Sequence, residues 1–458
     1  MQWRRLPSVW RRIFALAWPV MAEQTFRTLM RTVDIIVTAL ISPAAVVAIG
    51  LADLYARFPL RIGLGLGGGA IALSSQDTGS DADANRSEAI TQAILLGALT
   101  GVPFVVFGVL LGEFAIGLFP ASAEAIELGA VYLAIIFATA PARHVALIGA
   151  RALQGTGDTK TPMYVNVFTN SLNIGASATF GLGLFGAPAL GVVGVGLATA
   201  VANVVTAGLL LLAIYRPASG IDAVRPRDLT IAKQLVVISA PRLAEGFVSE
   251  IAEFPFNALL LGFGDAVNAG FQIGRRVYQQ VTGPIGRGYN VAASILVGQA
   301  LGEGNEADAR FNGWAVASLG LVTVGVIGLL LAWQAETVVT LLGSGEGEEL
   351  YYATQFAIVY GLSGPALALF VGVSGSLQGA SETRVPFFAR LTGMFGFFVG
   401  FSFLAVYVLD MGVFGAYLGV FLAYVWMALF VVVAFAYTGW ADRAIRMMEE
   451  RGSIDGGT

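Results

Sequence analysis

The sequence of 458 residues contains no cysteine and only one histidine, His144. Without cysteine the chain cannot form disulfide bonds or hold zinc or an iron–sulfur cluster through thiolates. One histidine among apolar neighbours leaves the common metal sites and general-base pairs without residues, so we expect no enzymatic activity and no bound cofactor. Charged residues make up 12% of the chain, about half of the roughly 25% that a soluble domain carries. This scarcity of charge excludes a soluble enzyme.

Hydrophobic residues, by contrast, make up 56% of the chain, in long runs separated by short clusters of Gly, Pro, Asp and Ser. A helix that crosses a bilayer needs about 20 apolar residues. The runs predict an all-α membrane protein with twelve transmembrane helices, at residues 12–41, 44–76, 87–118, 124–154, 160–184, 188–215, 229–262, 266–301, 308–341, 350–378, 384–408 and 413–440.

The loops that follow the odd-numbered helices contain no Lys or Arg, whereas both termini and the other loops carry most of them. Cytoplasmic loops are enriched in Lys and Arg, so we expect a multi-pass protein of the cell membrane with both termini in the cytoplasm. The chain has 2 lysines against 24 arginines, and loops such as residues 77–88 are acidic. This composition favours a halophilic archaeon as its source, with a GC-rich bacterial genome as the alternative.

The two halves of the sequence repeat each other. Residues recur at separations of 222–224 positions, in the pairs Pro19 and Pro241, Glu23 and Glu245, Gln76 and Gln299, Gln154 and Gln378, and Pro162 and Pro386. Six predicted helices separate the copies, which predicts two six-helix bundles of the same topology, related by a pseudo-two-fold axis along the membrane normal. We place the first bundle at 1–217 and the second at 218–458.

Several segments resemble one transporter family in order and spacing. They are the first helix with Pro19 and Asp34, the glycine-rich 63–69 ending in Ser75-Gln76, and the runs 153–162, 191–199 and 297–304. Together they resemble the multidrug and toxic compound extrusion (MATE) family of the multidrug/oligosaccharidyl-lipid/polysaccharide flippase superfamily. The resemblance covers nearly the whole chain. It implies export driven by a gradient of H⁺ or Na⁺, with the two bundles alternating access to a central site.

Asp34 lies at membrane depth in the first helix, where an ionisable side chain has a functional role by default. The resemblance implies that Asp34, Asn173 and Thr199 bind the coupling ion, and these three residues would form any Na⁺ site. Ser177 stands where related members carry a second aspartate, so we expect weaker Na⁺ binding and favour proton coupling. The alternative is that Asp34 forms a structural ion pair with Arg31.

Other charged residues at membrane depth lie in the predicted helices 1, 2, 7 and 8, the equivalents of one another in the two halves. We expect them to line a substrate cleft, and they are Glu23, Arg27, Arg31, Asp53, Arg57, Arg61, Glu245, Glu250, Glu253, Arg275 and Arg276. With Arg143, Arg242 and Arg287 the arginines number nine, against six carboxylates including Asp34. Arginine stays protonated when partly buried, so this excess predicts anionic or zwitterionic substrates. The alternative is a neutralised lattice of ion pairs.

The sequence therefore predicts a secondary active antiporter that exports small organic compounds in exchange for H⁺ or Na⁺. Its partners would be a small-molecule substrate and the lipid bilayer, with no nucleic acid, and we expect a monomer. One alternative is a flippase for an anionic lipid-linked oligosaccharide or a related lipid, because arginines suit a diphosphate. A second alternative, a channel or non-transporting sensor, has no need of the ion site.

Overall fold

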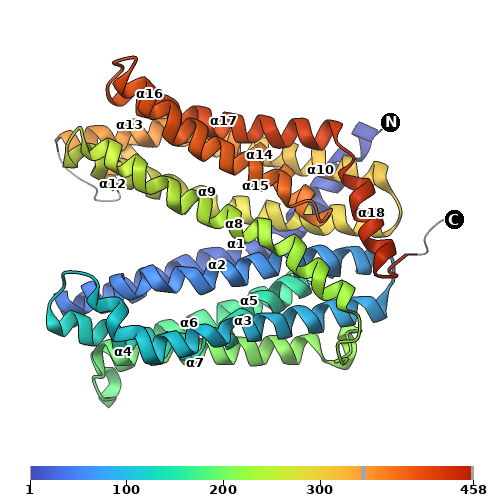
Figure 1. Ribbon diagram of the computed structural model, residues 1–458, viewed down its shortest axis with the longest axis horizontal. Coiled ribbons are helices and arrows are strands. Elements are labelled where there is room, and N and C mark those ends of the chain that lie inside the picture. Colours follow the sequence, from blue (N-terminus) through green and yellow to red (C-terminus); the bar gives the residue numbers. More distant parts are fainter. Residues whose placement is uncertain (1, 342–346, 455–458) are drawn as a thin grey trace. The chain divides into compact units, whose positions relative to one another are not determined.

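The computed structural model describes residues 2–341 and 347–454, and this part of the chain is almost entirely helical, without a strand (Figure 1). The helices of the first half are α1 (Leu6–Ile41), α2 (Pro43–Gly79), α3 (Asp83–Gly117), α4 (Ala123–Ala138), α5 (Ala140–Gly155), α6 (Lys160–Leu182) and α7 (Gly191–Ile214). Those of the second half are α8 (Leu229–Leu261), α9 (Asp265–Gly302), α10 (Glu306–Gly320), α11 (Val326–Trp333), α12 (Ala335–Leu341), α13 (Glu348–Leu362), α14 (Gly364–Gly379), α15 (Arg384–Thr392), α16 (Ser402–Tyr407), α17 (Val413–Tyr437) and α18 (Trp440–Glu450).

Each of the twelve predicted segments falls on one helix or on a run of consecutive helices, which confirms the predicted all-α fold. Six helices of the described part are long and apolar enough to cross a membrane, and eight are if each bent pair counts as one span. The helices α1, α6, α8 and α9 lie outside that group. Charged side chains interrupt α1, α8 and α9 at membrane depth, and such side chains are tolerated where they face the interior of a bundle.

Two predicted helices are bent rather than straight. The prediction of one helix at 124–154 is wrong in this respect, because α4 and α5 meet at an angle of 50°, and α13 and α14 divide 350–378 at 49°. Pro141 and Pro365 lie in the first turns of α5 and α14. Proline has no backbone N–H to continue the preceding helix. The two prolines are 224 residues apart, so the bends belong to the repeat.

The chain divides into two compact units that do not coincide with a single cut at residue 217. The first-half unit contains residues 22–239 and also 450–454, and the second-half unit contains residues 2–21 and 240–449. Helices α1 and α8 therefore each begin in one unit and end in the other. The changes occur at Met21/Ala22 and Ser239/Ala240, within three residues of the repeat-related Pro19 and Pro241.

Within the first-half unit, α2 packs against α3, α4 and α5, and α6 packs against α7 (Figure 1). Its core includes Val37, Ala52, Tyr132 and Phe137. The second-half unit has an aromatic core in which Phe256 stacks on Phe398 at 4.0 Å between ring centroids. In both units small residues allow close approach of helices, as is usual in membranes.

Substitution of Gly101 in α3 by alanine would test this close packing of helices. A Cβ atom there would lie 2.5 Å from the backbone nitrogen of Pro141 in α5, whereas a Cβ at Gly208 of α7 would meet nothing within 4 Å. Alanine in a helix interior is favoured over glycine by about 1 kcal/mol. We expect Gly208→Ala to keep or raise the midpoint of thermal unfolding in detergent and Gly101→Ala to lower it. Equal midpoints for the two variants would contradict the close contact of α3 and α5.

Candidate functional site

The residues predicted to bind the coupling ion meet inside the first-half unit. Asn173 of α6 donates a hydrogen bond from Nδ2 to the Thr199 hydroxyl of α7 at 3.2 Å, and the Ser177 hydroxyl donates to Oδ1 of Asn173 at 3.1 Å. Asp34 of α1 lies beside Ser177. Its Oδ1 atom is buried and has no hydrogen-bond partner in the described part of the chain. A buried carboxylate oxygen without a donor is the place where a proton or cation would bind.

Tyr132 of α4 completes this cluster, and the sequence analysis did not identify it. Its side chain is buried, hydrogen bonds with Thr199, and lies in the electrostatic field of both Asp34 and Asp53. Tyrosine can donate and accept a hydrogen bond. The cluster therefore joins α1, α4, α6 and α7 through Asp34, Ser177, Asn173, Thr199 and Tyr132, which we call the Asp34 cluster.

Three arginines surround Asp53 of α2 beside the Asp34 cluster. Arg31, Arg57 and Arg143 each interact electrostatically with Asp53, and Arg31 also acts on Asp34. The side chains of Arg31, Asp53 and Arg57 are exposed rather than packed in the core. The three arginines carry one more positive charge than Asp34 and Asp53 together can neutralise. We call Arg31, Asp53, Arg57 and Arg143 the arginine group.

Glu23 of α1, in contrast, is fully compensated. Its carboxylate is buried, pairs with Arg27 at 2.9 Å, and accepts a hydrogen bond from Gln154 at 3.3 Å. Gln154 in turn accepts from Arg151 at 2.8 Å. Both carboxylate oxygens of Glu23 therefore have a partner, unlike those of Asp34. For Glu23 and Arg27, the alternative of a neutral ion pair fits better than substrate contact.

The repeat-related Glu245 of α8 is held still more firmly in the second-half unit. Its buried carboxylate lies 2.6 Å from Arg242 and 2.9 Å from Arg390 of α15. Arg390 also donates to the Ser249 hydroxyl and covers the ring of Phe370 at 4.8 Å. The sequence analysis missed Arg390, which is 145 residues away from Glu245 along the chain.

Glu253 of α8 and Arg275 of α9 form a further ion pair of this unit. Arg275 also donates to Gln272 at 2.9 Å, and Gln272 donates to Asn257 at 2.7 Å. Tyr278, Tyr360 and Tyr424 lie nearby, and the buried Tyr278 hydroxyl has no hydrogen-bond partner in the described residues. The pair thus lies at the edge of an aromatic core.

The remaining predicted cleft residues do not share one arrangement. Arg276 is exposed on α9, while Arg61 and Glu250 are half-buried and interact with other residues. His144 is buried in the first-half unit, with Nε2 at 2.7 Å from the Pro59 carbonyl oxygen and Nδ1 at 3.1 Å from that of Gly97. It joins α5 to α2 and α3, in the structural role expected of it.

Comparison with known proteins decides the family. The model of the MatE family matches residues 19–179 and 243–404, once in each half of the chain. The chain belongs to the MatE family. It is 26% identical over 453 residues to a probable multidrug resistance protein NorM of Thermotoga maritima, with 97% of this chain and 96% of that protein covered.

A second relative is the multidrug resistance protein PmpM of Pseudomonas aeruginosa, 27% identical with 86% of this chain and 83% of that protein covered. Among solved structures, an outward-facing multidrug resistance MATE family transporter of the MOP superfamily superposes with a TM-score of 0.83 at 20% identity, covering 96% of each chain. This MATE chain is thus a multi-pass membrane transporter with multidrug efflux relatives, as its sequence predicts.

The two arginines beside Glu245 generate a stability prediction for this MATE transporter. Glu245→Gln removes the negative charge and leaves Arg242 and Arg390 close together without compensation. Loss of one partner of a buried ion pair costs about 3–5 kcal/mol. We expect a clear fall in the thermal unfolding midpoint and in the yield of monodisperse protein. Glu348→Gln, at an exposed position, is the control. Unchanged stability of Glu245→Gln would show that Glu245 is not a structural charge.

Proposed function

We propose that this MATE transporter exports small organic compounds in exchange for protons, by alternating access that depends on relative motion of its two units. The observation that carries the proposal is the buried, unpartnered Oδ1 of Asp34 within a cluster of neutral hydrogen-bonding side chains. Such a carboxylate can take up and release a proton without rearranging its neighbours. The multidrug resistance names of the relatives support the export of organic compounds.

The hydrogen bonds of the Asp34 cluster favour H⁺ over Na⁺ as the coupling ion. Na⁺ requires several oxygen ligands, and the candidates are Asp34, Asn173 and Thr199. However, Oδ1 of Asn173 already accepts from Ser177, and the Thr199 oxygen accepts from Nδ2 of Asn173. Each of these oxygens keeps one lone pair for a cation and neither adds negative charge, whereas a proton needs one oxygen of Asp34 only. Hard cations also gain from additional carboxylates, and Ser177 supplies none.

The arginine group supports a substrate with a carboxylate. A guanidinium binds a carboxylate through two parallel hydrogen bonds, and the exposed side chains of Arg31 and Arg57 are accessible to a ligand. An excess of positive charge near membrane depth also disfavours purely cationic compounds. All four residues of the arginine group lie within the first-half unit.

Exchange for protons restricts the substrate further. Protonation of Asp34 adds positive charge, so it strengthens the binding of a pure anion and weakens the binding of a cationic group. A pure anion would therefore travel with the proton rather than against it. A zwitterion satisfies both requirements, because its carboxylate pairs with arginine and its amine competes with the proton. We propose zwitterionic compounds as the preferred substrates.

In the membrane, we propose that the monomer lies in the cell membrane with both termini in the cytoplasm. The turns that join α1 to α2, α3 to α4, α6 to α7, α8 to α9 and α16 to α17 carry no Lys or Arg. The opposite ends of the helices carry Arg86, Lys160, Arg216, Arg310 and Arg384. This asymmetry fits the enrichment of basic residues in cytoplasmic loops.

Substitution of Asp34 tests the coupling. We expect Asp34→Asn to abolish uptake into inverted vesicles driven by a proton gradient, while counter-flow of the compound without a gradient persists. The change removes the charge at nearly constant volume, so folding should be retained. Asp410→Asn, in an exposed turn, is the control. Gradient-driven rates equal to those of the unsubstituted protein would refute the role of Asp34, and dependence on an imposed Na⁺ gradient instead of ΔpH would refute proton coupling.

The charge preference is tested with three forms of one fluorescent aryl carboxylate that carries a piperazine. They are the zwitterion, its N-acetyl derivative as the anion, and its methyl ester as the cation. We expect the zwitterion to be exported fastest. Arg57→Gln should lower its export about tenfold or more, since a hydrogen bond to a charged group contributes about 1.5–3 kcal/mol. Export of the ester should not change.

Arg225→Gln, in the exposed linker, controls for a general loss of arginine. Faster export of the ester than of either carboxylate, unaffected by Arg57→Gln, would contradict the proposed substrate class. Translocation of a fluorescent lipid diphosphate by the reconstituted protein, with export of none of the three compounds, would favour the alternative of a lipid flippase.

A further inference from the structure

The C-terminal end of the chain returns to the first-half unit. Helix α18 belongs to the second-half unit as far as Glu449, where Trp440 stacks on Phe435 and Arg443 pairs with Glu382 at 2.7 Å. Residues 450–454, which we call the tail, belong to the first-half unit. Within the described residues the chain therefore passes between the units at three places. Two of these lie within the continuous helices α1 and α8, and the third lies at the end of α18, between Glu449 and Glu450.

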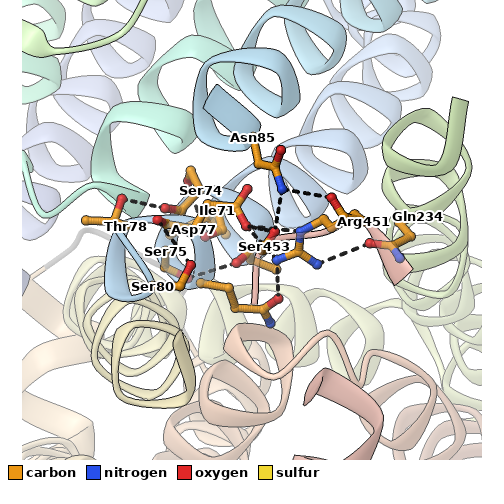
Figure 2. Close-up of polar contacts among 12 residues, drawn as sticks. Ile71, Ser74, Ser75, Asp77, Thr78, Ser80, Asn85, Gln234, Arg451 and Ser453 are labelled. Carbon is orange, nitrogen blue, oxygen red and sulfur yellow. Dashed lines mark hydrogen bonds and ion pairs between the residues drawn. The ribbon is translucent and has the colours of Figure 1, made fainter. Parts of the chain in front are cut away.

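A single arginine anchors the tail. Arg451 is buried, with a side chain that is 0% exposed, and contacts Oδ1 of Asp77 at 2.7 Å through Nη2 and at 3.0 Å through Nε (Figure 2). Nη2 also donates to Gln76 at 3.0 Å, and Nη1 donates to Gln234 at 3.1 Å. The guanidinium thus joins the end of α2 to the start of α8.

Three further hydrogen bonds hold the tail, one through its backbone and two through the Ser453 side chain. Asn85 of α3 donates from Nδ2 to the Arg451 carbonyl oxygen at 2.8 Å and to the Ser453 hydroxyl at 3.1 Å (Figure 2). Ser453 itself donates to Oδ1 of Asp77 at 2.8 Å. Oδ2 of Asp77 is buried and has no hydrogen-bond partner in the described residues. The pocket is thus polar and is filled by the tail.

The sequence repeat indicates why an arginine is needed there. With the separation of 222 that relates Glu23 to Glu245, Gln234 is the equivalent of Arg12. At a separation of 223, Gln76 is the equivalent of Gln299. In the second-half unit, Arg12 donates directly to Gln299 at 3.3 Å. In the first-half unit, two glutamines occupy the equivalent positions, and Arg451 donates to both. The tail therefore supplies the guanidinium that the first-half copy lacks.

The chemistry of this contact favours reversible binding over permanent cohesion. A buried ion pair is often less stabilising than apolar residues of similar volume, because both charges lose their hydration. Since Arg451 and Asp77 can be rehydrated when they separate, the docked and released states can be close in free energy. Release of the tail also breaks no helix, unlike separation at α1 or α8.

We propose that the tail is a detachable latch, which docks in the Asp77 pocket in one state of the transport cycle and leaves it in the other. The latch rests on the motion of the two units in the proposed function. When α18 moves with the second-half unit, the tail is drawn from the first-half unit, so docking of Arg451 stabilises one conformation over the other. The occupant of the pocket is thus a segment of this chain.

The natural absence of cysteine permits a direct test. In Asn85→Cys/Ser453→Cys, a short thiol-specific cross-linker that reductants cleave would fix the tail in its pocket. We expect cross-linking to lower export of the zwitterionic compound about tenfold or more, with recovery after reduction. The matched control is Ser87→Cys/Asp222→Cys, which fixes the linker to α3 where the Asp222 amide donates to Ser87 at 3.1 Å. This control should retain its export rate.

Full export by the cross-linked tail variant would show that the tail is a static structural element and would overturn the proposal. Failure of the pair to cross-link would overturn the docked position itself, and equal inhibition of the control pair would contradict the assignment to the tail. A second measurement needs no transported compound. The rate at which a charged maleimide labels Ser453→Cys reports release of the tail, and Asp77→Asn should raise it about tenfold or more.

An unchanged labelling rate in Asp77→Asn would contradict the anchoring role of Asp77. Accelerated labelling in a protein that exports none of the tested compounds would refute the proposed export function and support the docked tail. The two readouts therefore separate failure of the latch from failure of the proposed transport activity.

Discussion

The interior of a bilayer accepts an ionised side chain only where a counter-charge, hydrogen-bond donors or water replace its lost hydration. The two halves of this transporter meet that requirement differently. Glu245 is neutralised by Arg242 and Arg390, and Glu253 by Arg275, so the carboxylates of the second-half unit are fixed. In the first-half unit Asp34 keeps an oxygen without a donor. The proposed proton coupling rests on this incomplete compensation at Asp34.

The compensated charges of α1 and α8 lie close to the places where these helices pass between the units. Helices α1 and α8 carry charges at membrane depth and pass from one unit to the other close to Pro19 and Pro241. A proline inside a helix removes one backbone hydrogen bond and weakens the helix locally. The ion pairs of Glu23 and Glu245 begin four residues beyond these prolines, where each helix joins the unit in which it ends. In both helices the proline therefore precedes the paired glutamate by the same four residues.

The sequence predicted the twelve helical segments because hydropathy and repeat are local or periodic signals. It also predicted that Asn173, Ser177 and Thr199 meet, since they belong to recognisable segments of two helices that follow each other. Tyr132 and Arg390 were missed, because their partners are distant along the chain and no spacing rule connects them. The bends at Pro141 and Pro365 had a signal, a proline pair separated by 224 residues, that was not used.

A pattern of charges along the sequence did not predict the surroundings of the eleven residues expected to line the cleft. Their position in equivalent helices of the two halves predicted one role for all of them, yet Glu23 and Glu245 are buried in ion pairs while Asp53 and Arg57 are exposed. The difference depends on partners in other helices, namely Gln154 for Glu23 and Arg390 for Glu245.

Asp77 and Arg451 extend the contrast between the halves to the helix ends. Repeat-related positions hold Gln76 and Asp77 in one half and Gln299 and Ala300 in the other, so only the first half places a carboxylate in this pocket. Asp77 needs a positive partner, and Gln234, which stands at the position of Arg12 in the other copy, carries no charge. Arg451, from the C-terminal end of the chain, pairs with Asp77 instead. In both places, Asp34 and Asp77, the first half departs from its copy by a carboxylate, and we propose that each exchanges its partner, a proton at Asp34 and the tail at Asp77.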